Sequence, residues 1–334
     1  EVNGVKYTGK NIVLATGSYP KTLPGLDIDG TQIITSEQAI AMDRVPKSVI
    51  VLGGGVIGCE FASVWKSFGS EVTIIEGLPH LIALEDESSS KGLERAFRKR
   101  GINFELGTRF KSASKDAKGV TVILEDGKTF TAEVLLVAVG RGPVSSNLGY
   151  EEAGLTMDRG YVLVDNKCRT NVAGIWAVGD LIPTLQLAHV GFGEGILVAE
   201  EIGGLNPRPI NYDGVPRVTY SEPEVASVGL TTSQAKERGH DVVELNYDLA
   251  GNGKAQILKT AGAIKLVAAK NGPVLGIHMV GARVGELLAE AQLIFNWEAE
   301  ASDVAALIHA HPTLSEAVGE AHLALAGKPL HAHG

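Results

Sequence analysis

Residues 48–60 read SVIVLGGGVIGCE, a run of apolar residues that passes directly into three spaced glycines. The apolar run predicts a buried parallel strand, and the residues that follow it, 56–68, predict a helix. Between the two, Gly53 permits a tight turn, Gly55 lets the backbone approach a pyrophosphate, and Gly58 lets the helix pack close to the strand. Unpaired N–H groups at the start of such a helix favour a bound phosphate. This pattern predicts a dinucleotide-binding turn.

An acidic residue ends the next predicted strand, which reads EVTIIE over residues 71–76. A carboxylate at Glu76 would hydrogen-bond the ribose hydroxyls of NAD and repel the additional phosphate of NADP. No arginine lies between Glu71 and Arg95, so the sequence favours NAD. Strand, turn, helix, strand and terminal acid together predict a doubly wound, Rossmann-like α/β domain. The competing interpretation is a glycine-rich turn that binds no nucleotide.

Composition narrows the possible partners. The chain has 334 residues, enough for two or more domains, and a formal net charge of −9. That charge argues against nucleic acid and anionic membranes as partners, because both are polyanions. No apolar run is long enough to cross a bilayer. The two cysteines, Cys59 and Cys168, are far apart in sequence and indicate a reduced, cytoplasmic protein without a disulfide framework.

Three further apolar runs end at glycines, namely Gly17, Gly140 and Gly179, and the first of them, within residues 11–18, predicts a buried strand that ends in a glycine turn. Such strand ends form the ligand-binding edge of doubly wound sheets. Asp180, directly after the last of them, either holds a sugar-like hydroxyl chain or caps the next helix. After residue 211 the sequence changes to short strands followed by two helices, which predicts an α+β domain suited to dimerisation. The predicted division is 1–45, 46–140, 141–212 and 213–334.

An acid–base candidate lies near the end of the chain, where residues 309–316 read HAHPTLSE. A carboxylate at Glu316 would orient the imidazole of His311 and stabilise its charged form, as in a general base. The structural alternative is a capping box, because Thr313 and Glu316 have the required spacing. Spacing alone favours the cap. A metal site is not expected, because the histidines lack partner ligands at usable spacing.

These motifs together resemble the pyridine nucleotide-disulfide oxidoreductases, and most closely the members that oxidise dihydrolipoamide in 2-oxo acid dehydrogenase complexes. The resemblance covers essentially the whole chain. It is carried by ATGS (15–18), the glycine turn with Glu60 and Glu76, AVGR (138–141), AVGD (177–180), LAH (187–189), SEPEVASVG (221–229) and HAHPTLSE (309–316).

The resemblance implies FAD and NAD as cofactors, a homodimer, and dihydrolipoamide on a lipoyl domain as substrate. By the resemblance, His311 is the base, paired with Glu316, and it reaches the active site of the partner subunit. A catalytic role for this pair is therefore favoured over a purely structural cap, although both can hold at once. Residues 141–144 depart from the family pattern, because Val144 replaces an asparagine, and no contact is assigned to them. The implied FAD contacts are Thr16, Gly17, Ser18, Asp180, Gln186, Leu187, Ala188 and His189. The implied NAD contacts are Gly53, Gly54, Gly55, Val56, Ile57, Gly58, Glu60, Glu76, Phe110 and Gly140.

The chain also departs from the family in what it lacks. Family members carry an N-terminal FAD fingerprint and a Cys-x4-Cys redox pair, and this sequence has neither. Cys59 and Cys168 are expected to be small packing residues. The resemblance therefore implies the C-terminal portion of such an enzyme, with residues 1–45 ending an FAD domain and with no turnover by this portion alone. The alternatives are a non-catalytic NAD-binding dimerisation fragment and a glutathione or mercuric reductase, although Glu76 argues against the NADPH preference of those reductases.

Overall fold

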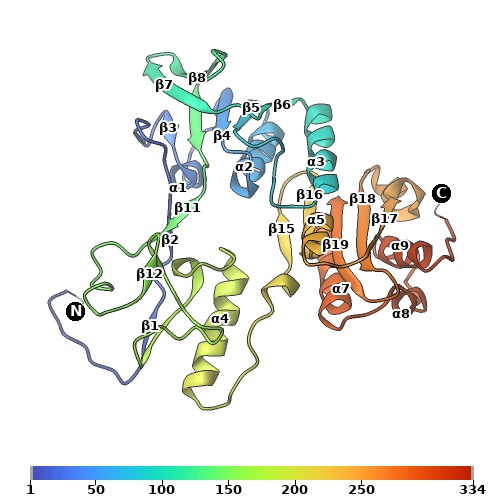
Figure 1. Cartoon of the computed structure of the whole chain (residues 1–334). Coiled ribbons are helices and arrows are strands. Elements are labelled where there is room, and N and C mark those ends of the chain that lie inside the picture. The colour runs from blue at the N-terminus through green and yellow to red at the C-terminus, as the bar shows by residue number, and fades with distance from the viewer. Residues whose placement is uncertain (1–2, 332–334) are drawn as a thin grey trace. The chain divides into compact units, whose positions relative to one another are not determined.

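The computed structural model describes residues 3–331 and divides into two compact units (Figure 1). One unit joins the residues up to Lys21 with Gly140–Tyr212, and the other joins Thr22–Val139 with the chain from Asp213 onward. Residues 22–45, which the sequence places with the first domain, share a unit with the predicted NAD-binding domain. The four-domain division stays a prediction. None of the helices between residues 3 and 331 has the length and hydropathy of a membrane span.

The first unit consists of short strand pairs and one long helix. Strand β1 pairs in parallel with β14, β2 pairs antiparallel with β11, and β12 pairs with β13. Side chains of β1 are exposed, with Ile12 at 47% and Val13 at 45%, so the expectation of a buried strand in this stretch is wrong here. The elements are β1 (Ile12–Leu14), β2 (Ser18–Pro20), β11 (Arg141–Pro143), β12 (Met157–Asp158), β13 (Tyr161–Val162), β14 (Ile175–Ala177), the 3-10 helix η1 (Gly179–Leu181) and α4 (Ala188–Ile202).

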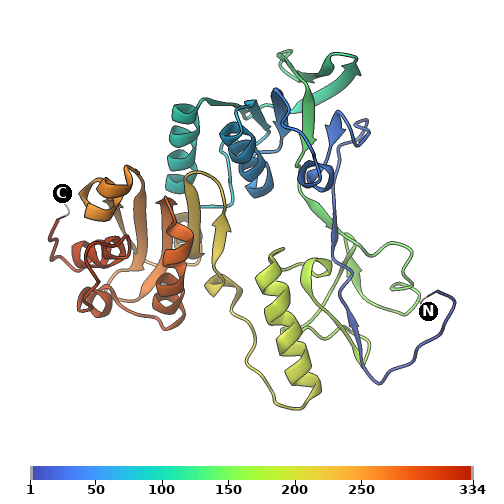
Figure 2. The same ribbon diagram turned by 180° about the vertical axis from the view of Figure 1, so that it is seen from behind.

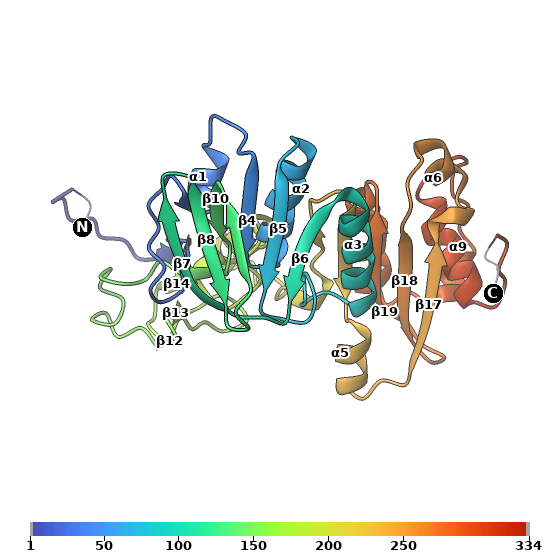
Figure 3. The same ribbon diagram turned by 90° about the horizontal axis from the view of Figure 1, so that it is seen from above.

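The second unit contains a five-stranded sheet in the order β3-β10-β4-β5-β6, in which every neighbouring pair is parallel. Figure 3 shows β10, β4, β5 and β6 side by side, with α3 next to β6. A three-stranded antiparallel sheet, β7-β8-β9, packs against it. The elements are β3 (Ile33–Ile34), α1 (Ser36–Ile40), β4 (Ser48–Leu52), α2 (Val56–Ser67), β5 (Glu71–Glu76), α3 (Glu87–Arg100), β6 (Ile102–Leu106), β7 (Phe110–Asp116), β8 (Gly119–Leu124), β9 (Thr129–Ala132) and β10 (Val134–Val137).

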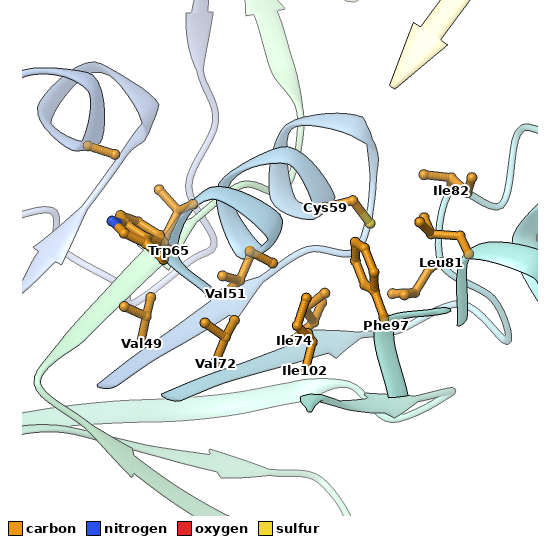
Figure 4. Packing of buried hydrophobic residues seen from close by; sticks show 14 of the residues in the cluster. Val49, Val51, Cys59, Trp65, Val72, Ile74, Leu81, Ile82, Phe97 and Ile102 are labelled. Atoms are coloured by element: carbon orange, nitrogen blue, oxygen red, sulfur yellow. The ribbon is translucent and has the colours of Figure 1, made fainter. Parts of the chain in front are cut away.

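Burial on both faces explains the continuous apolar run of β4. Val49 and Val51 face helices α2 and α3 in one core cluster, which also contains Trp65 and Phe97 (Figure 4). Ile50 and Leu52 belong to a second cluster, in which strands β8 and β9 also take part. Successive residues of a strand point to opposite faces, so a strand covered on both sides needs apolar residues at every position. The predicted Rossmann-like fold is confirmed.

The chain from Asp213 onward forms an α+β domain, as predicted. Its five strands lie in the order β15-β16-β19-β18-β17 and all neighbours are antiparallel. Helices α7 and α9 pack on one face of this sheet (Figure 2). The elements are the 3-10 helix η2 (Tyr212–Gly214), which straddles the boundary between the units, β15 (Arg217–Thr219), β16 (Glu224–Gly229), α5 (Thr232–Glu237), β17 (Val242–Asp248), η3 (Leu249–Gly251), α6 (Gly253–Leu258), β18 (Ala263–Ala269), β19 (Val274–Gly281), α7 (Val284–Asn296), α8 (Ala301–Ala305) and α9 (Glu316–Leu325).

Candidate functional site

The three glycines after β4 have different steric roles. Gly53 has a φ of +111°, and a Cβ there would lie 2.3 Å from the carbonyl oxygen of Ala138. A Cβ on Gly58 would lie 1.9 Å from the carbonyl oxygen of Gly53, so helix α2 can pack this closely only without a side chain. Gly55 caps α2, and no described atom lies within 4 Å of the Cβ that a side chain would place there. Open space over the start of a 12-residue helix suits the close approach of a phosphate.

Glu76 lies at the end of β5, beside this turn. Its Oε2 accepts a hydrogen bond from the Gly54 N–H at 2.6 Å, and its Oε1 accepts one from the Leu78 N–H at 2.8 Å. The carboxylate is therefore held in one orientation, next to the turn that would receive the pyrophosphate. The position of the Glu76 carboxylate beside the glycine turn fits its predicted role, which is to bind the ribose of NAD.

The other predicted NAD contacts in this unit lie on helix α2 and strand β7. Val56 and Ile57 form the first turn of α2. The carboxylate of Glu60, one turn further along, accepts the Tyr220 N–H at 2.8 Å, and burial raises the pKa of Glu60 despite this hydrogen bond. Phe110 begins β7 and packs, half-buried, against the core cluster beneath the sheet.

Gly140 falls in the first unit, where its carbonyl oxygen accepts the Lys21 N–H at 2.9 Å. Its predicted NAD contact stays a prediction.

In the first unit, Ser18 and Asp180 meet although they are far apart in sequence. Ser18 Oγ donates to Asp180 Oδ2 at 2.5 Å and accepts from Arg141 Nε at 2.6 Å. The Arg141 guanidinium also donates to the Ser18 carbonyl oxygen at 2.7 Å and lies 3.9 Å from Asp180 Oδ2. Sequence reasoning assigned Arg141 no contact. Its pairing with Ser18 follows from the antiparallel alignment of β2 with β11, which no local pattern reveals.

The backbone around Thr16 and Gly17 belongs to the same cluster. Thr16 Oγ1 donates to the carbonyl oxygen of Val144 at 2.6 Å, and the Val144 N–H donates to the Gly17 carbonyl at 2.9 Å. The predicted FAD contacts from 16 to 18 and Asp180 are therefore held together by residues 141–144.

The remaining predicted FAD contacts surround the start of α4. Leu187 caps this helix, and Ala188 and His189 form its first turn. Gln186 Nε2 is buried and has no hydrogen-bond partner within residues 3–331. An unpaired buried amide is costly, so this donor suits a polar group of a bound ligand. A polar donor at Gln186 therefore fits a bound flavin.

Sequence reasoning missed Glu194 on α4, a fully buried carboxylate. It accepts hydrogen bonds from the Gly179 N–H at 2.6 Å, Thr184 Oγ1 at 2.8 Å and Tyr212 Oη at 2.9 Å. Glu194 thereby supports the turn that carries Asp180. The available signal was an acid placed directly between two glycines, Gly193 and Gly195, with apolar residues on either side.

His311 and Glu316, the predicted acid–base pair, lie in contact in the α+β domain, and their catalytic role stays a prediction. His311 Nδ1 lies 2.8 Å from Glu316 Oε1, and the imidazole remains largely exposed. Glu316 Oε2 accepts the Thr313 N–H at 2.7 Å, and Thr313 Oγ1 accepts the Glu316 N–H at 3.3 Å. Partial burial opposes ionisation, but the hydrogen bonds from Thr313 and His311 lower the pKa of Glu316 overall. The reciprocal hydrogen bonds of the predicted capping box and the pairing with His311 occur together, although α9 begins at Glu316, so its N-cap is Ser315 rather than Thr313.

Both cysteines are free and buried. Burial, with nearby carboxylates, raises the pKa of Cys59, and burial raises the pKa of Cys168 to about 12. Thiols of this kind are protonated at neutral pH and are poor nucleophiles. Within residues 3–331, no cluster of three or more His, Cys, Asp or Glu side chains is arranged to hold a metal ion.

The chain belongs to the pyridine nucleotide-disulphide oxidoreductase family. Residues 1–195 match the family's oxidoreductase domain, and residues 215–322 match its dimerisation domain. Members of this family are enzymes that use FAD and NAD(H), so the predicted oxidoreductase class and cofactors are confirmed.

The similar curated proteins include dihydrolipoyl dehydrogenases. One from Bacillus subtilis is 41% identical over 96% of this chain and 69% of its own length, and one from Cupriavidus necator is 40% identical over 97% and 70%. A leghemoglobin reductase from Glycine max is 38% identical over 97% of this chain and 63% of its own length.

Solved structures show the same fold. The crystal structure of LpdA from Mycobacterium tuberculosis matches with a TM-score of 0.88 at 29% identity, over 94% of this chain and 69% of that one. The flavoprotein disulfide reductase RclA from Escherichia coli, as its Cu(II) complex, also matches with a TM-score of 0.88, at 27% identity, over 95% and 73% of the respective chains.

Proposed function

We propose that this chain carries the NAD(H) site, part of the flavin site and the acid–base pair of a dihydrolipoyl dehydrogenase. The reaction is the oxidation of dihydrolipoamide by NAD⁺ to lipoamide, NADH and a proton. The relatives that bear this name support the assignment. The observation that carries it is the 2.8 Å contact between His311 and Glu316 in the dimerisation domain.

In this proposal His311 is the base. Its ring accepts the proton of a dihydrolipoamide thiol, and Glu316 stabilises the imidazolium that forms. The thiolate attacks a protein disulfide, forms a mixed disulfide and displaces one cysteine thiolate. The second thiol of dihydrolipoamide then attacks the mixed disulfide, which closes the ring of lipoamide and releases the other cysteine, so the cysteine pair is left reduced. FAD, which residues 16–18, Asp180 and 186–189 would hold, would supply the electron transfer between the reduced cysteines and NAD⁺. We propose that His311 serves the site of a second subunit in a homodimer, and the exposure of its imidazole on its own subunit supports this.

The cofactor residues follow from the two clusters described above. We propose that the glycine turn, the first turn of α2, Glu60 and Glu76 hold NAD, together with Phe110 and Gly140. We propose that residues 16–18, Asp180 and residues 186–189 contact FAD, with Arg141 fixing Ser18 and Asp180.

The disulfide step needs cysteines other than the two in this chain. Cys59 and Cys168 are buried and protonated, so neither is a reactive thiolate. We propose that the redox pair belongs to a part of the enzyme outside these 334 residues, and that these residues alone do not turn over lipoamide. Because both cysteines are free thiols, a reducing, cytoplasmic compartment is part of the same proposal.

Two measurements test the proposal. Titration calorimetry should show NADH uptake by the folded chain, and no NADH should form from FAD, NAD⁺ and dihydrolipoamide until the part with the redox cysteines is supplied. A folded chain that takes up no NADH would refute the assigned nucleotide site. NADH uptake without turnover, even with the redox part present, would instead favour a non-catalytic NAD-binding dimerisation fragment.

A further inference from the structure

The loop of residues 77–86 joins β5 to α3 and packs directly on the glycine turn. The Ile82 N–H donates to the Gly54 carbonyl oxygen at 2.8 Å. A Cβ on Gly54 would lie 2.6 Å from Leu81 Cδ2, so the Leu81 side chain packs directly against the turn at Gly54. Figure 4 shows Leu81 and Ile82 together beside Cys59 and Phe97. The loop therefore supports the same Gly54 whose N–H binds Glu76.

The backbone of this loop is strained at Ile82. Its φ is +43°, in the left-handed region that β-branched residues rarely adopt. Strain of this kind persists only where the surroundings hold it, and it concentrates at functional sites. Glu94 holds the preceding residues, because its Oε1 accepts the Leu81 N–H at 3.2 Å and lies 3.0 Å from His80 Nδ1.

The far end of the loop is tied to the antiparallel sheet by charges. The Asp86 carboxylate lies 2.9 and 3.1 Å from Lys265 Nζ on β18 and accepts the Thr232 N–H at 3.2 Å. Glu85 accepts a hydrogen bond from Ser227 Oγ on β16 at 2.5 Å. Asp86, Ser227 and Lys265 are all buried, so solvent screens these contacts little.

The sheet residues involved form one row. Arg217, Ser227, His278 and Lys265 are directly opposite one another across β15, β16, β19 and β18, so their side chains share one face. Glu85 lies 3.5 Å from the Arg217 guanidinium at one end of this row. Burying charges costs free energy that apolar residues would not, so such a row is poorly explained by stability alone.

We propose that Asp86 and Lys265 are positioning residues for the adenosine half of the bound dinucleotide. They fix the far end of the 77–86 loop, and the loop in turn fixes Gly54 and Glu76. The proposal rests on the NAD(H) site proposed above. It predicts that the antiparallel sheet, which contributes no predicted ribose or pyrophosphate contact, sets part of the nucleotide affinity.

The variant Asp86→Asn tests this. Asparagine caps a helix as well as aspartate does, so the Ser88 N–H keeps its acceptor, while the charge pair with Lys265 is lost. Lys265 keeps a second partner, Glu244, at 2.8 Å. The matched control is Asp29→Asn, because Asp29 also accepts backbone N–H groups and pairs with a lysine, Lys115, away from the loop.

Affinities for NADH, ADP-ribose and reduced nicotinamide mononucleotide should be measured on the full chain by titration calorimetry. For Asp86→Asn we expect about five- to tenfold weaker binding of NADH and ADP-ribose, with the mononucleotide unchanged. Protection of the Ile82 amide against hydrogen exchange should also fall. A general loss of structure would weaken the binding of all three ligands. Weaker binding of ADP-ribose with unchanged binding of the mononucleotide therefore distinguishes a positioning role from an effect on stability.

Unchanged ADP-ribose affinity in folded Asp86→Asn would overturn the inference, and so would an equal loss in Asp29→Asn. If Asp86→Asn does not fold, Ser227→Ala removes the hydroxyl that donates to Glu85 and accepts from Arg217 Nε at 3.2 Å, and it should weaken ADP-ribose binding in the same direction but less. No change in that variant would then overturn the inference. Absence of NADH binding by the unmodified chain would refute the proposed function itself, which is a different outcome.

Discussion

One carboxylate oxygen of Glu316 lies 2.8 Å from Nδ1 of His311, while the other accepts the Thr313 N–H in the reciprocal hydrogen bonds expected of a capping box, at the start of α9. The two interpretations of this stretch are therefore not exclusive. A base whose orienting acid is itself fixed by a helix start loses little conformational freedom when it binds substrate.

Replacing the orienting acid should slow proton transfer. In the complete, flavin-loaded enzyme, Glu316→Gln should lower turnover of dihydrolipoamide about 100-fold, because glutamine cannot stabilise the imidazolium. Steady-state formation of NADH measures this. The control is His331→Gln, which disrupts another exposed His–Glu pair, with Glu320 at 2.9 Å, and should leave turnover unchanged. Equal rates in Glu316→Gln and the unmodified enzyme would exclude His311 with Glu316 as the base.

Substitutions at two glycines of the turn should have different effects, one on the stability of the fold and the other on NADH binding. Gly58→Ala places a Cβ 1.9 Å from the Gly53 carbonyl oxygen and should cost about 1–3 kcal/mol of unfolding free energy. Gly55→Val points into open space, so it should leave the unfolding free energy nearly unchanged and abolish NADH uptake. Urea unfolding and calorimetry on both variants give the comparison. NADH uptake that survives in Gly55→Val contradicts the pyrophosphate site.

Glu76 should set the preference between the two dinucleotides. Glu76→Gln keeps the shape of the side chain and removes its negative charge. NADH should therefore bind about tenfold more weakly, and the additional phosphate of NADPH should no longer be repelled. Competition titrations with NADH and NADPH measure the ratio of affinities. The control is Glu71→Gln at the exposed start of the same strand. A ratio unaffected by Glu76→Gln would remove Glu76 from the ribose site.

Two buried histidines should make the fold sensitive to mild acid. Burial lowers the pKa of His278 and of His322 below the ordinary value of 6.5. As pH falls below 6.5, the unfolded chain binds protons that the folded chain excludes, so stability falls, by up to about 1.4 kcal/mol per pH unit for each histidine. Denaturant unfolding between pH 7 and 5 measures the slope. His322→Gln should flatten it, and an unchanged slope would show that His322 does not contribute.

Local signals in the sequence were sufficient for several elements. The helical spacing and charged face of residues 87–100, followed by Gly101, predict a helix, and α3 has these bounds, because Asp86 caps its start and Gly101 takes the left-handed conformation at its end. Strand β5 also has its predicted bounds. Caps, turns and apolar periodicity act between residues a few positions apart, so the local sequence carries them.

Contacts between distant segments could not be predicted this way. Arg141 meets Ser18 across 123 residues, and Lys265 meets Asp86 across 179. The exposure of Ile12 and Val13 likewise depends on which segments cover β1, since their apolar character alone suggested a buried strand. Such contacts depend on which distant segments of the chain the tertiary fold brings together and on how their strands align. The glycine turn, the acid that ends the next strand and the closeness of His311 to Glu316 therefore follow from the sequence alone, because these depend on residues near one another in the chain. The contacts of Asp86 and Glu85 with the antiparallel sheet were set only by the tertiary fold, which brings distant segments together.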